Sequence, residues 1–349
     1  MYKKTIIILV ILSWISCQTS AQVQQPKNII LVVIDGFGMD HLTASAVANG
    51  GKSNLFNLSH TGFLQIHDTT SIQINPVSSI SKIACGTETY PGGLGKDKNK
   101  NDVTNILESA KKENKAVGIV STSSITYPSS AAFFAHQSNY QKRERIASSI
   151  LEADLDVFIG GGLKYFNKRS DGEDLTKDLR KKGYKLYEQV GKLEKGRAKK
   201  VAGLVFTDHP DKAGLRGEYL QIAWHKAFRT LVKDDNGYFM LVNLTHIDWA
   251  CQANDPDYLL AELKDMELFI EQLLKYVGSD RESLLIITSS YNRGLIEIEN
   301  KNNEISLKIK DNGITPALVP VFANGPGAEN FSGVYKNTDL YMKLRTLLF

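Results

Sequence analysis

The segment at residues 28–40, NIILVVIDGFGMD, constrains the fold more than any other part of this chain. Residues 29–34 form an apolar run without alternation, which is typical of a strand buried on both faces of a parallel sheet. Asp35 follows this run, and Gly36 and Gly38 allow a sharp turn. Because α/β proteins bind ligands at the carboxyl ends of parallel strands, the segment predicts a carboxylate at the ligand-binding edge. An Asp in this place can also simply cap the next helix, so its neighbours decide its role.

The first 21 residues have the pattern of a secretory signal peptide. Two lysines precede an apolar run over residues 5–15, which is too short to span a bilayer, and small and polar residues lead to Ala21. We therefore expect a mature chain from residue 22 that is periplasmic or secreted. A lipoprotein attached through Cys17 is the alternative, although Trp14 stands where such signals usually carry Leu.

Charge and cysteine content exclude several classes of protein. The net charge is +4, and loss of Lys3 and Lys4 with the leader lowers it to +2, which does not favour binding to nucleic acid or a membrane surface. No later segment reads as a transmembrane helix. Cys85 and Cys251 could form one disulfide but have no metal-ligand spacing. Since no linker or repeat divides the chain, we expect one domain over residues 22–349.

Strands and helices alternate along the rest of the chain. The helix at 256–275 is the clearest, because its apolar residues form one broad stripe. The charged residues 163–200 predict a solvated excursion with one helix. The alternation predicts an α/β fold with a largely parallel central sheet sandwiched by helices. The other expected strands are 61–66, 116–121, 156–159, 238–244, 284–288 and 317–322, and the other expected helices are 41–48, 102–112, 218–232 and one from about residue 338.

The segment at residues 75–95, NPVSSISKIACGTETYPGGLG, predicts a helix start at the edge of a pocket. The free backbone N–H groups of such a start can hold an anion. An ordinary capped helix uses the same residue types, so both interpretations stay open.

Six segments, in order along the chain, resemble the alkaline phosphatase family. They are IDGFG, ACGTETYPGGLG, GIVSTSSITYPSSAAFFAH, IGGG, the strand before HID, and VPVFANGPGA. The resemblance covers essentially the whole mature chain and implies an alkaline-phosphatase-like α/β fold. It also implies a metal-dependent phosphomonoester hydrolase with a Ser or Thr nucleophile, two zinc ions, a magnesium ion and an arginine that clamps the phosphoryl group. A homodimer is a further implication of the family.

Three positions of the resemblance keep residues that could bind metal. Asp35 falls on the bridging metal carboxylate, Asp248 on a zinc-binding aspartate, and Ser129 on a hydroxyl ligand of the magnesium site. Zinc accepts N and O donors, and magnesium prefers oxygen. These three residues are the residual metal candidates.

Most other metal ligands of the family are replaced. The metal-binding glutamate aligns with Asn243, and a ligand histidine aligns with Gln252. The Asp-His pair at a strand end reads Ser290-Tyr291, and the last ligand histidine aligns with Ile314. Neutral amides and hydroxyls do not offset the charge of zinc, so we expect the affinity for zinc and magnesium to fall steeply.

The nucleophile and the arginine clamp are replaced as well. The clamp aligns with Tyr140. Without a gap, the nucleophile falls on Pro76 and the aspartate before it on Asn75. A slip of two or three residues would bring Ser78 or Ser79 into the catalytic position, but such a slip turns a helix start by more than half a revolution.

These substitutions predict an exported pseudoenzyme of the alkaline phosphatase fold, inactive or strongly impaired as a phosphatase. Its remnant pocket would bind a phosphate- or sulfate-bearing small molecule or a partner protein. The alternative is a working phosphatase or related ester hydrolase with a reorganised site that uses Asp35, Asp248 and a serine near Ser78. The histidines show no HxxxH or HExxH spacing, and only His246 lies beside a candidate ligand.

Overall fold

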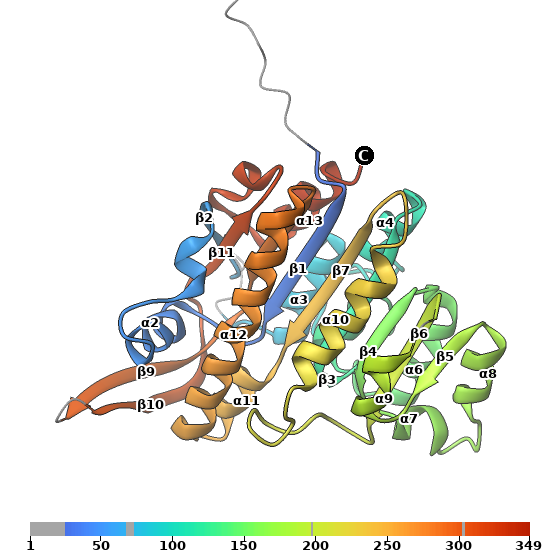
Figure 1. Ribbon diagram of the computed structural model, residues 1–349, viewed down its shortest axis with the longest axis horizontal. Coiled ribbons are helices and arrows are strands. Elements are labelled where there is room, and N and C mark those ends of the chain that lie inside the picture. Colours follow the sequence, from blue (N-terminus) through green and yellow to red (C-terminus); the bar gives the residue numbers. More distant parts are fainter. Residues whose placement is uncertain (1–24, 68–72, 197, 302–303) are drawn as a thin grey trace, which may run out of the picture.

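The computed structural model describes residues 25–67, 73–196, 198–301 and 304–349 (Figure 1). The expected signal peptide over residues 1–21, with Cys17, lies outside these ranges and stays a prediction. Across the described ranges, no helix is long and apolar enough to cross a membrane.

A ten-stranded sheet forms the centre of the molecule. Its described strands run parallel to one another except β11, which is antiparallel to both of its neighbours. The largely parallel sheet expected from the sequence is therefore confirmed. The strand order is β12 (Gly333–Lys336), β2 (His60–Gln65), β11 (Val319–Asn324), β8 (Ser283–Thr288), β1 (Asn28–Ile34), β7 (Tyr238–Leu244), β3 (Ala116–Ser124), β4 (Val157–Gly161), β6 (Lys200–Phe206) and β5 (Tyr184–Tyr187).

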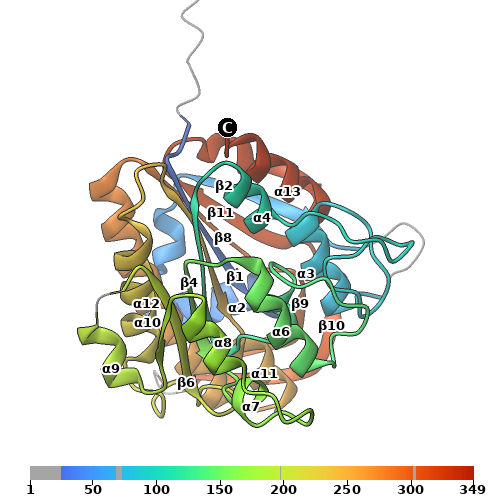
Figure 2. The same cartoon turned by 90° about the vertical axis from the view of Figure 1, so that its right-hand side faces the viewer.

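Helices cover both faces of the sheet (Figures 1 and 2). Neighbouring residues of β1 point to opposite faces, so that Leu31 packs in one core and Val32 in the other, which explains its unalternated apolar run. The first layer contains α3 (Pro76–Cys85), α4 (Ile106–Lys112), α5 (Pro128–Ala131), α6 (Arg143–Ala153), α7 (Lys164–Asn167), α8 (Leu175–Lys181), η2 (Ala328–Phe331) and α13 (Asn337–Thr346). The second contains α2 (Met39–Ala48), η1 (Asn54–Asn57), α9 (Val190–Lys195), α10 (Tyr219–Leu231), α11 (His246–Gln252) and α12 (Pro256–Asp280).

A separate antiparallel hairpin is formed by β9 (Asn292–Lys301) and β10 (Glu304–Thr315). It packs beside α2, α11 and α12, and Figure 1 shows it extending from the sheet at the lower left. The sequence did not predict these strands. Because β9 begins four residues after the end of β8, its first residues lie at the carboxyl edge of the sheet.

The charged segment 163–200 contains more structure than the solvated excursion expected from its composition. It holds α7, α8, β5, α9 and the first residue of β6. Tyr184 and Tyr187 of β5 are buried, while Lys185 between them is exposed. A four-residue edge strand that carries an exposed lysine is too short for recognition by its pattern, so the expectation was wrong here.

The two cysteines of the described chain are both buried and unpaired. Cys85 packs in the core on one face of the sheet, and Cys251 packs in the core on the other. The disulfide that the sequence left open therefore does not form.

Candidate functional site at the carboxyl edge of the sheet

Asp35 lies at the carboxyl end of β1, beside the ends of β7 and β8. Its side chain is fully buried, and its backbone N–H donates to the carbonyl oxygen of Leu244 at 2.8 Å. Ser129 of α5 donates from Oγ to Asp35 Oδ2 at 2.6 Å. Within the described part of the chain, Asp35 Oδ1 has no hydrogen-bond partner. Two of the three residual metal candidates are thus in direct contact.

The electrostatic surroundings of Asp35 disfavour its ionised form. Burial raises the pKa of Asp35 to about 7, the Ser129 hydrogen bond opposes this shift, and the charge of Asp248 adds to it. The nearby polar side chains of Asn243 and Thr245 oppose it more weakly. All four neighbours are neutral or negative, so the protein itself supplies no cation to this carboxylate.

Asp248, in the first turn of α11, differs from Asp35 because both of its carboxylate oxygens accept hydrogen bonds from side chains. Arg293 donates from Nε to Asp248 Oδ1, and the side-chain amide of Gln252 donates to Oδ2. Arg293 also donates from Nη1 to the carbonyl oxygen of Asn312 at 2.9 Å, which fixes the guanidinium. Burial raises the pKa of Asp248, and Arg293 opposes the rise. Both oxygens at this metal candidate are therefore occupied by protein donors.

The hairpin brings Arg293 to this place. The backbone N–H of Arg293 donates to the carbonyl oxygen of Gly36 at 2.9 Å, and Ile314 of β10 pairs with Arg293 across the hairpin. Gly36 has φ +75°, and a Cβ there would lie 3.0 Å from Cα and Cβ of Asp248. A glycine is thus needed for the turn after β1 to approach α11. Sequence reasoning missed Arg293, whose only signal was its place two residues after the substituted position Tyr291.

Three neutral residues stand at the other substituted ligand positions. Asn243 donates from Nδ2 to the carbonyl oxygen of Val33 at 3.3 Å and accepts from Thr245 Oγ1 at 2.9 Å. Ser290 is fully buried, and its Oγ has no partner in the described ranges. Burial raises the pKa of Tyr291 well above its ordinary value, and Asp248 and Asp35 raise it further. Tyr291 therefore stays a neutral phenol beside the two carboxylates.

Ser78 lies at the start of α3 in a capping arrangement. Asn75 caps the helix, because its Oδ1 accepts the backbone N–H of Ser78 at 3.0 Å. Ser78 Oγ donates to the same Oδ1 at 3.3 Å or to the carbonyl oxygen of Tyr90 at 3.2 Å. Pro76, the ungapped nucleophile position, is the first residue of the helix and carries no hydroxyl. No carboxylate or imidazole is bonded to Ser78 in the described structure.

Ser79 links three elements of the fold. It is 3 % exposed, and its Oγ donates to the backbone carbonyl oxygen of Ser290 at the end of β8. It also accepts from Nδ2 of Asn337 in α13 at 3.2 Å. These bonds hold α3 against the sheet, and they occupy the hydroxyl proton that a nucleophile would pass to a base.

The position of the family's arginine clamp is filled by an aromatic residue. Tyr140 packs against the core, with its ring 3.4 Å from the point where a Cβ would stand on Gly92. Arg143, three residues later, donates from Nη1 to the carbonyl oxygen of Thr126 at 2.6 Å and lies 5.0 Å from the ring centroid of Tyr127. Tyr127 in turn has its pKa raised to about 12 by burial, with Asp35 and Asp248 adding to the rise. Sequence reasoning missed this pair.

His246 is a structural histidine. Its Nε2 donates to the carbonyl oxygen of Thr122 at 2.8 Å, so its Nδ1 accepts from the hydroxyl of Tyr258. Burial, followed by the charge of Arg216, lowers the pKa of His246 to about 3. Both ring nitrogens are used within the fold.

The donor set does not fit the zinc and magnesium centre that the family implies. Among the described residues, no group of three or more His, Cys, Asp or Glu side chains is placed to hold a metal ion. Asp248 is occupied by Arg293 and Gln252, and Asp35 retains one free oxygen. A catalytic zinc site usually keeps three protein ligands, and the candidates at this edge offer one carboxylate oxygen without a hydrogen-bond partner, the buried Oδ1 of Asp35.

Comparisons with known proteins agree with the geometry of the fold. A family model for alkaline phosphatase matches residues 26–297. Alkaline phosphatase 4 of Bacillus subtilis (strain 168) is 29% identical over 286 residues, which are 77% of this chain and 62% of that protein, so the chain spans less than two thirds of this relative. The structure of alkaline phosphatase from the Antarctic bacterium TAB5 is 30% identical with a TM-score of 0.87, and the match covers 94% of this chain and 99% of that one. The Thermus thermophilus alkaline phosphatase, 19% identical with a TM-score of 0.84, shares the fold. This chain therefore belongs to the alkaline phosphatase family.

Proposed function

We propose that this chain is an exported alkaline-phosphatase-fold protein that is inactive or strongly impaired as a phosphatase and binds a phosphate- or sulfate-bearing small molecule. The observation that carries the proposal is the pairing of Asp248 with Arg293 and Gln252. A guanidinium stays protonated at any physiological pH, so Arg293 acts as a permanent cation at a position where the family places zinc. Metal binding at Asp248 would first have to displace it.

Displacement of Arg293 is unfavourable because its side chain is 17 % exposed and its partner is 1 % exposed. Breaking a buried ion pair leaves an uncompensated charge, which costs several kcal/mol, roughly 3 to 5 in measured cases. Asn243, Ser290 and Tyr291 add no charge that would attract a metal in exchange. The geometry therefore supports a metal-poor site.

Anion binding is supported by the free donor capacity of the same arginine. Arg293 uses Nε and Nη1 in the hydrogen bonds given above, while Nη2 has no hydrogen-bond partner in the described ranges. Guanidinium groups match the paired oxygens of phosphate and sulfate esters.

The homodimer that the family implies and the single domain over residues 22–349 remain predictions.

The second candidate is a hydrolase with a reorganised site. The unpartnered Oδ1 of Asp35 favours it, because a buried carboxylate oxygen without a donor can hold a cation. Such an enzyme would need Asp248 and a serine near Ser78 as well, and both side chains are occupied by the bonds described above.

Metal content and turnover decide between the two. We expect purified protein to contain far less than one zinc or magnesium per chain by elemental analysis, and added metal to produce no turnover of an aryl phosphate. Tightly bound stoichiometric zinc, together with turnover that disappears in Asp35→Asn, would overturn the first proposal. Metal-stimulated turnover that Ser78→Ala abolishes would establish the second.

A further inference from the structure

A cavity of about 500 Å³ lies between α9 and α10, on elements that do not carry Asp35 or Asp248. Four basic side chains line it, and a single carboxylate, that of Glu194, is among its lining residues. The basic residues are Lys195, Lys226, Arg229 and Lys233.

The sequence places three of these cations on one side of a helix. Lys226, Arg229 and Lys233 are spaced three and four residues apart on α10 and just beyond its end, so they share one face, and this face packs against α9. Like charges at this spacing repel each other. Cations near a helix C-terminus also complement the helix dipole, which accounts for Arg229 and Lys233 but does not require a buried lysine.

Lys226 is the informative member of this group, because its side chain is only 2 % exposed. Its Nζ donates to the carbonyl oxygen of Gly196 and to the hydroxyl of Tyr187 at 3.4 Å, and lies 4.7 Å from the Tyr187 ring centroid. No carboxylate in the described ranges lies within ion-pair distance of Nζ. Lysines are almost never fully buried without a counter-ion, because an unpaired ammonium loses its hydration.

The neighbouring charges increase this imbalance. Burial lowers the pKa of Lys226 to about 8, and Arg229, Lys185 and Lys233 lower it further. The three charged neighbours that shift the pKa of Lys226 are all positive, so they add to its charge and do not balance it. A bound anion would supply the missing charge.

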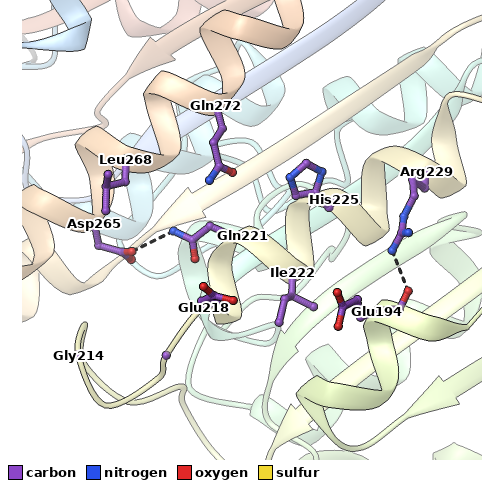
Figure 3. Close-up of a pocket in the computed structure, with 11 residues that line it drawn as sticks. Glu194, Gly214, Glu218, Gln221, Ile222, His225, Arg229, Asp265, Leu268 and Gln272 are labelled. Carbon is purple, nitrogen blue, oxygen red and sulfur yellow. Dashed lines mark hydrogen bonds between the residues drawn. The ribbon is translucent and has the colours of Figure 1, made fainter.

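Glu194 does not provide that balance. Arg229 donates from Nη2 to the backbone carbonyl oxygen of Glu194 at 2.9 Å. Figure 3 shows the Glu194 carboxylate beside Ile222 of an adjacent cavity, which is also lined by Gln221 and His225, and this carboxylate is not joined to Arg229. Arg229 and Glu194 line both cavities, and among the described residues the Glu194 carboxylate makes no ion pair with Lys226, Arg229 or Lys233.

We propose that the cavity between α9 and α10 is a binding site for a small oxyanion of the phosphate or sulfate type, held by Lys226, Arg229 and Lys233. This site is separate from the carboxyl edge of the sheet and does not rest on the function proposed for that edge. Phosphate oxygens accept several charge-assisted hydrogen bonds at once, which matches three cations on one helix face.

Isothermal titration with inorganic phosphate, in chloride buffer of constant ionic strength, tests the proposal on the full mature chain. We expect saturable binding at millimolar phosphate or below, and about tenfold or greater weakening in Arg229→Gln and in Lys233→Gln, since each loses one charge-assisted bond. Lys226→Met should weaken binding as well, and the two exposed positions decide the result if this variant does not fold. Sulfate should compete with phosphate.

Two control variants locate the binding. Lys177→Gln removes a 73 % exposed lysine from α8, and Lys310→Gln removes a 42 % exposed lysine from the hairpin of β9 and β10. Both should bind phosphate as the parent chain does. The proposal is overturned if the parent chain gives no saturable heat, if either control variant loses as much affinity as Arg229→Gln, or if Arg229→Gln and Lys233→Gln bind phosphate as tightly as the parent chain does.

Discussion

Asp35 and Asp248 lie at the same edge of the sheet, close enough for the charge of Asp248 to raise the pKa of Asp35. Only Asp248 is paired with a cation, the guanidinium of Arg293. Asp248 receives a guanidinium and an amide on its two oxygens, whereas Asp35 receives one hydroxyl and keeps the other oxygen free. Both positions align with metal ligands of the family. The comparison shows that missing ligands are only part of the change at this site. Protein donors also occupy the oxygens of Asp248, where a metal ion would bind, but they leave Oδ1 of Asp35 free.

Asp35→Asn should produce the largest effect, because it removes the carboxylate that has no cation. The native pKa of about 7 lies above the ordinary value of 3.8, so between these pH values the folded state holds a proton that the unfolded state releases. The free energy of unfolding should therefore fall by roughly 4 kcal/mol as the pH rises through this window, and Asn should abolish the fall. Urea unfolding at several pH values measures this difference.

The control for this prediction is Asp235→Asn, which changes an exposed carboxylate in a loop and should leave the pH profile unaltered. At pH values above the native pKa of Asp35, we expect Asp35→Asn to be more stable than the parent chain. A less stable Asp35→Asn under those conditions would indicate that Asp35 holds a metal ion, which would break the comparison with Asp248.

Arg293→Gln should come next, with a loss of about 3 kcal/mol in the free energy of unfolding, because it leaves Asp248 buried without its cation. Lys310→Gln, which removes a 42 % exposed lysine from the same hairpin, should cost about 0.5 kcal/mol or less. Combining Arg293→Gln with Asp248→Asn should recover part of the loss, as a double-mutant cycle would measure. Equal effects of Arg293→Gln and Lys310→Gln would contradict the role given to Arg293.

Ser129→Ala should have a smaller effect, a loss of about 1 kcal/mol, because it removes the one side-chain donor seen on Asp35 Oδ2. The pKa of Asp35 should rise further, since the Ser129 hydrogen bond lowers it. Ser130→Ala is the matched control, as Ser130 Oγ is buried without a partner in the described structure. Indistinguishable thermal midpoints of the two variants would remove Ser129 from the site.

Added zinc should produce the smallest effect. With Asp248 occupied and five ligand positions filled by neutral residues, we expect the thermal midpoint to be the same with zinc chloride and with a chelator. A zinc-dependent rise that disappears in Asp35→Asn would show that the free oxygen of Asp35 is a metal site after all.

Much of the fold could be predicted from the sequence, because its signals are local. The strand at 238–244 was expected with the bounds that β7 has, and the run before Asp35 lies in the middle of the sheet. The edge strand β5 and the hairpin of β9 and β10 were missed. The edge strand β5 has only four residues, so its pattern carries little information. The hairpin does show a signal that could have revealed it, because apolar and polar residues alternate at 296–299 and 305–310.

Less of the candidate site could be predicted. The motif residues Asp35 and Ser129 were named from the sequence, and the structure places them in hydrogen-bond contact. Arg293 was not named, because its partner Asp248 is 45 residues away in the chain and the hairpin that joins them was not expected. The pair of Arg143 and Tyr127 was missed for another reason, because a lone arginine after a substituted clamp position carries no local signature.

The sequence by itself determined the family, the central strand and the absence of most metal-ligand residue types at their expected positions. These follow from side-chain chemistry and from patterns that are read within a few residues. Only the tertiary structure decided which charges are paired: Arg293 neutralises Asp248, whereas Asp35 and Lys226 are buried without a counter-ion among the described residues. Electrostatic pairing depends on distance and burial, and the chain sets both only when distant segments pack together.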